Sequence, residues 1–178
     1  MGRDKATVVV DGVTLAARTA GVLVAAGLPG PLIEVGPGRS GLRAVPDGIP
    51  GCGPLGAVAT GVAALRAGGF AGGALVVATD LPHLDPGILS WLATHPAPGS
   101  VVPLRYRRPQ WLCARYSPAA LDAAAGLVAS GRSALAELAA GPGTHLAGED
   151  ELVAAGLRAE GLDDADTPDE LARIVGAR

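Results

Sequence analysis

Residues 74–82, with the sequence Ala-Leu-Val-Val-Ala-Thr-Asp-Leu-Pro, pass from an uncharged, mostly apolar stretch to a carboxylate and a proline. An apolar stretch without polar alternation predicts a buried strand of a parallel sheet with helices on both faces. Asp80 then lies at the carboxyl end of the strand, the edge where ligands bind in open α/β sheets. Its carboxylate either holds a divalent cation against phosphate oxygens or caps the next turn.

The composition indicates one globular domain over residues 1–178. Of the 178 residues, 49% are hydrophobic and 17% charged, which is enough to bury a core. The net charge of −3 argues against a nucleic-acid partner, which requires a basic face. No apolar run approaches the roughly twenty residues of a membrane helix, and the start does not resemble a signal peptide. We therefore expect a cytoplasmic protein with no membrane partner.

Turn and capping residues divide the chain into alternating strands and helices. Strands are predicted over residues 32–35, 74–79, 101–104 and 111–116. Helices are predicted over residues 14–26, from 55 to Gly68-Gly69, from Pro86, from Pro118 to Gly131, over 134–140 and from Pro168. This order predicts a three-layer, Rossmann-like α/β fold with a mostly parallel sheet and right-handed crossovers.

The arginine cluster and the two cysteines are not explained by this pattern of strands and helices. Arg105, Arg107 and Arg108 form the densest basic cluster, which is either a solvated loop or a phosphate site. Cys52 and Cys113 lack the spacing of metal ligands and are predicted to be free thiols. There is no Gly-x-Ser-x-Gly elbow and no Gly-x-Gly-x-x-Gly after a strand, which argues against a serine hydrolase and a dinucleotide-binding domain.

Five motifs occur in the order seen in molybdenum cofactor guanylyltransferases. They are Met1-Gly2-Arg3-Asp4-Lys5, Pro46-Asp47, Gly53-Pro54-Leu55-Gly56, Thr79-Asp80-Leu81-Pro82 and Asp164-Ala165-Asp166-Thr167-Pro168-Asp169. Over nearly its whole length the chain thus resembles this MobA-like nucleotidyltransferase family. The motifs are less specific for the guanylyl member, because cytidylyl transferases of the same cofactor and sugar-phosphate nucleotidyltransferases look similar in these places.

The resemblance also implies a strand and a Leu-Ala-Gly-Gly turn ahead of residue 1. We expect Met1 to be an internal methionine of the nucleotide loop and the upstream strand to be central in the sheet. Without that strand, two neighbouring strands expose unpaired ladder groups. An N-terminal peptide of the native protein that begins at Met1 or Gly2 contradicts this expectation.

The same resemblance implies a nucleotide site and a metal site. Lys5 resembles the lysine that reaches the nucleotide phosphates, and Asp80 resembles the magnesium ligand; these two are the expected catalytic residues. The remaining expected nucleotide-binding positions are Gly36, Asp47, Gly53 and Pro54. Asp47 also fits a simple turn, because it lies in a Pro-Asp-Gly sequence.

On the acceptor side, Asp164 and Asp166 occupy positions where guanylyltransferases often have asparagines. The resemblance implies that Asp166 makes a second metal contact and that both residues contact the acceptor; alternatively, Asp166 solvates the start of the last helix. Arg107 and Arg108 are candidates for binding the anionic pterin phosphate.

The implied reaction transfers GMP from GTP to molybdenum-molybdopterin, with Mg²⁺ as cofactor and pyrophosphate as leaving group. Positioning and electrostatics carry such a reaction. The expected partners are GTP, the molybdopterin cofactor and a molybdoenzyme or cofactor-delivery protein. Two alternatives stay open: a cytidylyl or sugar-phosphate nucleotidyltransferase, and a truncated homologue that binds without catalysis.

Overall fold

A computed structural model describes residues 5–48 and 52–165, so the helix predicted from Pro168 lies outside the described residues. The helices are α1 (Leu15–Ala25), α2 (Gly53–Ala67), α3 (Pro86–Thr94), α4 (Pro118–Ala129) and α5 (Glu149–Ala154), with 3-10 turns η1 (Lys5–Thr7), η2 (Leu135–Glu137) and η3 (Ala159–Leu162). The strands are β1 (Val9–Val10), β2 (Val13–Thr14), β3 (Ile33–Val35), β4 (Arg43–Val45), β5 (Ala74–Val77), β6 (Val101–Arg105), β7 (Arg108–Pro109), β8 (Cys113–Tyr116) and β9 (His145–Ala147).

Side-chain caps fix the starts of three helices where the sequence predicts them. Thr14, Asp85 and Ser117 each accept a backbone N–H from the first turn of α1, α3 and α4, respectively. The helix predicted over residues 134–140 is wrong, because only the 3-10 turn η2 forms there and Ser133 does not cap it. A seven-residue stretch without a cap is too short to sustain a helix on its own.

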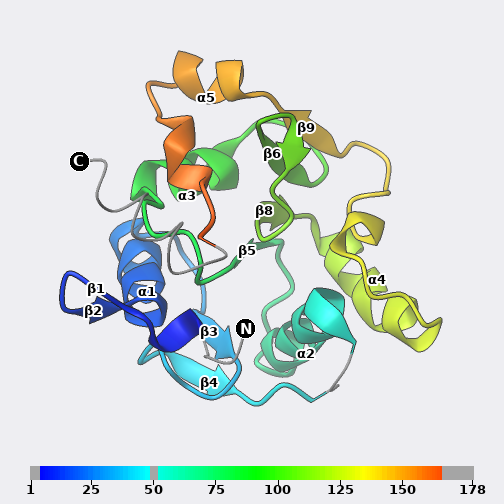
Figure 1. Cartoon of the computed structure of the whole chain (residues 1–178). Helices are drawn as coiled ribbons and strands as arrows, with labels where there is room; N and C mark the ends of the chain where they lie inside the picture. Colours follow the sequence, from blue (N-terminus) through cyan, green and yellow to red (C-terminus); the bar gives the residue numbers. More distant parts are fainter. Residues whose placement is uncertain (1–4, 49–51, 166–178) are drawn as a thin grey trace.

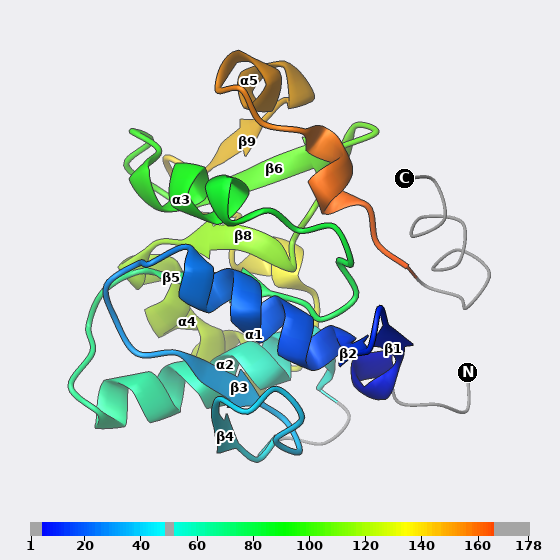
Figure 2. The same ribbon diagram turned by 90° about the vertical axis from the view of Figure 1, so that its left-hand side faces the viewer.

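The main sheet has β8 inserted between β5 and β6. Because β8 runs antiparallel to both, β5 and β6 point in the same direction and are joined by the crossover through α3 (Figure 2). β9 adds to the sheet parallel to β6. Among the described residues only two of six strand pairings are parallel, so a mostly parallel sheet is not confirmed. The connection from β6 to β8 is too short for the crossover that parallel neighbours need.

Helices cover both faces of this sheet, which gives the predicted three layers. Figure 1 shows α1 and α3 on one side and α2 and α4 on the other. Successive residues of β6 point into the two cores: Val101 packs in the core that contains Leu89, and Val102 in the core that contains Leu55. No helix among the described residues is long and apolar enough to span a membrane.

The two cysteines are free thiols, as predicted. Cys113 lies in the core formed with α3, where burial raises the pKa of its thiol to about 12. Because the thiolate is the reactive form, Cys113 acts as a small apolar core residue at neutral pH.

The strand β5 is half-buried along its whole length, whereas the sequence predicts a buried strand. Among the described residues β5 pairs with β8 alone, and β3 pairs with β4 in a separate, parallel two-stranded sheet. A largely apolar groove of about 580 Å³, lined by Ile33 of β3 and Leu75 of β5 among others, lies between these two segments. The strand therefore keeps one open side, which explains its exposure.

Candidate functional site

Lys5 and Asp80, the two expected catalytic residues, lie side by side. Asp80 follows the carboxyl end of β5, and its carbonyl oxygen accepts the N–H of Ala165 at 2.9 Å. The Nζ atom of Lys5, in η1, lies 3.7 Å from Oδ2 of Asp80. Both side chains are partly exposed, so this ion pair is accessible to a ligand from solvent.

Asp80 lines a cavity of about 370 Å³, a size typical of small-molecule sites. Pro54 at the start of α2, Trp111 before β8 and Asp164 after η3 line the same cavity. The fold thus brings three predicted site residues, Pro54, Asp80 and Asp164, to one place. None of the described residues that line the larger groove beside β3 and β5 is acidic, so the smaller cavity is the one with chemistry suited to a metal and phosphates.

Gly53 does not itself line this cavity, but it directly precedes Pro54, which does. Gly53 has φ of +60°, a conformation that glycine adopts without strain. A Cβ atom at this position would lie 3.6 Å from the carbonyl oxygen of Ser133, which lines the cavity. That distance is ordinary van der Waals contact, so the positive φ, and not a lack of space, is what favours glycine at this position.

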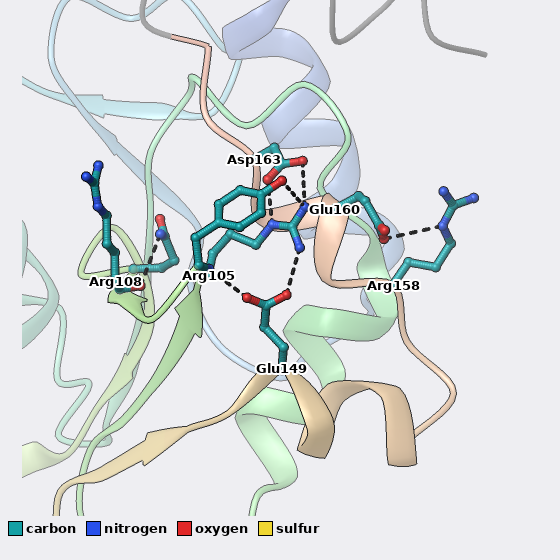
Figure 3. Close-up of polar contacts among 8 residues, drawn as sticks. Arg105, Arg108, Glu149, Arg158, Glu160 and Asp163 are labelled. Carbon is teal, nitrogen blue, oxygen red and sulfur yellow. Dashed lines mark hydrogen bonds and ion pairs between the residues drawn. The ribbon is translucent and has the colours of Figure 1, made fainter.

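The other predicted residues do not line the cavity. Gly36 follows β3 and donates its N–H to the carbonyl oxygen of Val45, while Asp47 is exposed after β4. Arg107, in the turn between β6 and β7, and Arg108, the first residue of β7, are exposed, and Arg108 points away from Arg105 (Figure 3). Asp166 lies outside the described residues.

Arg105, in contrast to Arg107 and Arg108, is buried, with 8% of its surface exposed. Its Nε and Nη2 atoms donate to Asp163 at 2.6 and 3.0 Å, and Nη1 donates to Glu149 at 2.8 Å (Figure 3). The hydrogen bond to Asp163 is the main cause that raises the pKa of Arg105, with a smaller contribution from Glu149. This bidentate bond fixes the segment after η3 and so holds Asp164 at the cavity.

Sequence reasoning grouped Arg105 with the solvated arginines and missed this role. A signal was available, because the alternation of a strand places Arg105 on the same face as Val101 and Pro103, both of which are buried. A buried arginine needs carboxylate partners. The sequence does not show that these partners are Asp163 and Glu149.

The donor set at the cavity fits a hard divalent cation bound with phosphates. Magnesium takes oxygen ligands, commonly one or two carboxylates plus substrate phosphates, and both Asp80 and Asp164 line this cavity. The ammonium of Lys5 adds a point charge suited to phosphate oxygens. The site can therefore hold a metal and a phosphorylated ligand without a covalent nucleophile.

Comparison with known proteins shows the family and the fold of the chain. A sequence model of the MobA-like NTP transferase domain matches residues 1–148. The fold is similar to the crystal structure of molybdopterin-guanine dinucleotide biosynthesis protein A from Archaeoglobus fulgidus, with a TM-score of 0.78 and 17% identity over 98% of this chain and 90% of that one.

A protein from Aquifex aeolicus VF5 is also similar, with a TM-score of 0.59 and 14% identity over 76% of this chain and 69% of that one. No curated protein sequence is significantly similar to the chain. The domain match covers more than half of the sequence, and the chain therefore belongs to the MobA-like NTP transferase family.

Proposed function

We propose that this nucleotidyltransferase transfers GMP from GTP to molybdenum-molybdopterin in the cytoplasm, with release of pyrophosphate. The observation that carries the proposal is the Lys5–Asp80 pair at a cavity that also contains Asp164. The name of the similar Archaeoglobus protein supports guanine as the base and the pterin as the acceptor.

Lys5 and Asp80 divide the catalytic work in this proposal. In the free protein Lys5 pairs with Asp80; when the nucleotide binds, the ammonium turns to the phosphate oxygens and offsets their negative charge. Asp80 holds the magnesium ion, with Asp166 as the proposed second ligand. When bound, the ion supplies further neutralisation of phosphate charge.

The reaction is an in-line displacement at the α-phosphorus. An oxygen of the acceptor's terminal phosphate forms the new P–O bond while the bond to pyrophosphate breaks. No protein atom bonds to the nucleotide, so the chain contributes position and charge.

In this proposal the nucleotide and the acceptor bind to different sets of residues around the cavity. Gly53 and Pro54 contact the nucleotide. Gly36 and Asp47 also contact the nucleotide in this proposal, because they follow β3 and β4, which run parallel and so end at one edge. Asp164, with Arg107 and Arg108, serves the acceptor, and a molybdoenzyme or cofactor-delivery protein receives the product.

Calorimetric titration with magnesium and GTP, and separately with CTP, tests the choice of base. We expect GTP to bind at least tenfold more tightly than CTP, and Asp80→Asn to weaken the binding. A preference for CTP would assign the protein to the cytidylyl transferases. Absence of binding to either nucleotide would identify a non-catalytic relative.

A further inference from the structure

Three side chains from three elements converge at the end of the sheet away from Asp80. They are His95, which follows the last residue of α3, His145, the first residue of β9, and Glu151, in the first turn of α5. Their ligand atoms all lie within 4.8 Å of one another, and this is the one such group of His, Cys, Asp or Glu within residues 5–48 and 52–165. The nucleotidyl transfer proposed above uses none of them.

The register of β6 shows that this histidine cluster is separate from the candidate nucleotide site. His145 pairs with Val101, the first residue of β6, whereas Arg105, the last residue, contacts Asp163 beside the cavity. At about 3.3 Å per residue, the two ends of β6 are about 13 Å apart. Figure 2 shows β9 and α5 at the outer edge of the sheet, beyond β6.

The carboxylate of Glu151 is already oriented toward both imidazoles. Its Oε1 atom accepts the N–H of Gly148, the residue before α5, at 2.9 Å and lies 3.1 Å from Nε2 of His145. Its Oε2 atom lies 2.9 Å from Nε2 of His145 and 3.5 Å from Nε2 of His95. A hydrogen bond that holds the non-coordinating oxygen is a common feature of carboxylate metal ligands.

Two of the donor separations are close to those around a small tetrahedral ion. Zinc binds imidazole nitrogen and carboxylate oxygen at about 2.0–2.2 Å, so neighbouring donors of a tetrahedral site lie about 3.4 Å apart. The two Nε2 to Oε2 distances, 2.9 and 3.5 Å, lie on either side of that value. Two imidazoles in a set of three favour zinc over calcium or magnesium, which prefer oxygen.

One ring must turn for metal to bind. His95 and His145 are stacked with an interplanar angle of 22°, but the in-plane lone pairs of two ligands must converge on one ion. The N–H of Ala97 also donates to Nδ1 of His95 at 3.2 Å, which places the proton of the neutral ring on Nε2. Binding through Nε2 moves that proton to Nδ1, so His95 turns away from Ala97 and out of the stack.

We propose that His95, His145 and Glu151 form a zinc site with three protein ligands and one position for water. The ion would join the end of α3 to β9 and α5, segments that are distant in sequence. Because the ligands come from separate elements, zinc binds the folded chain more tightly than the unfolded one and stabilises it.

Zinc alone, added to untagged protein without nucleotide, tests this site independently of the proposed function. We expect one equivalent to bind and the Tm to rise. His145→Ala changes the most exposed of the three ligands and should weaken binding at least tenfold, as should Glu151→Gln. His83→Ala, which removes a histidine outside the cluster, should bind as the wild type does.

Cobalt(II) in place of zinc supplies a second readout. We expect visible absorption bands of a four-coordinate site in the wild type and their loss in His145→Ala, whose fold is checked by circular dichroism. The proposal is overturned if the wild type binds no zinc, or if the His95→Ala/His145→Ala double variant keeps one equivalent with unchanged affinity. A cluster that only exchanges protons would give the first of these results.

Discussion

The two ends of β6 both gather charged side chains from distant segments, but they use them differently. At the carboxyl end, Arg105 is satisfied by Asp163 and Glu149, while Asp80 and Asp164 line a cavity. At the amino end, His95, His145 and Glu151 face one another directly. At the carboxyl end, the residue that positions the site, Arg105, is distinct from the residues that would contact a ligand, Asp80 and Asp164. At the amino end, the three residues that hold one another in place would also bind the ligand.

Asp80→Asn removes the negative charge that the proposed mechanism uses to hold the metal at the cavity. Of the variants considered, it should therefore reduce activity the most. We expect kcat/KM for nucleotidyl transfer to fall at least 100-fold, the cost typical of losing one electrostatic contact to a transition state. The Tm should change little, because the side chain is partly exposed. Steady-state kinetics decide, with the exposed Asp122→Asn in α4 as the matched control. Near-normal turnover of Asp80→Asn would contradict the mechanism.

Arg105→Ala tests whether Arg105 positions Asp164 at the carboxyl end of β6. Removing a buried arginine that is bonded to two carboxylates should lower the free energy of unfolding by about 2–4 kcal/mol, as measured in urea. It should also lower kcat/KM, because Asp164 loses its support.

Arg158→Ala is the matched control for this loss. The Arg158 side chain is 86% exposed and pairs with Glu160 at 3.7 Å. Its removal should therefore lower the free energy of unfolding by less than about 0.5 kcal/mol. Equal losses in Arg105→Ala and Arg158→Ala would mean that burial at the end of β6 is not what makes Arg105 important.

The double variant Arg107→Ala/Arg108→Ala asks whether the exposed arginines extend the cavity end toward the acceptor. If they bind the pterin phosphate, the acceptor KM should rise about three- to tenfold with kcat preserved, because the lost contacts act on binding. An unchanged acceptor KM would confine acceptor binding to residues such as Asp164.

Glu34 lies away from both ends of β6, and its substitution should reduce stability less than Arg105→Ala does. Its carboxylate accepts the N–H groups of Gly38, Arg39 and Ser40 and the hydroxyl of Ser40, at 2.6–2.9 Å. Partial burial raises the pKa of Glu34, but these hydrogen bonds outweigh it, so the pKa lies below its ordinary value of 4.5.

A carboxyl group whose pKa is lower in the folded protein than in the unfolded one stabilises the fold at pH values above the unfolded pKa. This stabilisation is lost as the pH falls through the folded pKa. Glu34→Gln should therefore cost about 1 kcal/mol at pH 7 and less in acid. Urea unfolding of both proteins across pH 3–7 measures the difference. A difference that does not shrink below pH 4.5 would show that the carboxylate charge is not the source of stability.

Local features of the fold were predictable because their causes lie within a few residues. Thr14, Asp85 and Ser117 cap helices through bonds to residues two or three positions away. Asp11-Gly12 makes the tight turn between β1 and β2 with both residues at positive φ, so the cause again lies in the turn residues themselves. The sequence alone contains everything that these predictions need.

Long-range pairing was not predictable in the same way. The apolar runs predict β5, β6 and β8 but not that β8 lies between the other two, since strand order depends on the path of the whole chain. The site shows the same limit. The family resemblance assigned Lys5 and Asp80 to one expected nucleotide and metal site, and the two lie side by side. The partners of Arg105 and the contact of His95 with His145 depend on a topology that no motif encodes.

The most direct test of the central claim is to supply the protein with magnesium, equal concentrations of the four nucleoside triphosphates and molybdenum-molybdopterin. Mass spectrometry then identifies which nucleotide is joined to the pterin, and a coupled assay counts pyrophosphate. We expect the guanine dinucleotide and pyrophosphate in equal amounts, both abolished by Asp80→Asn but not by Asp122→Asn. Failure to form any pterin dinucleotide, or equal product from Asp80→Asn, would contradict the account.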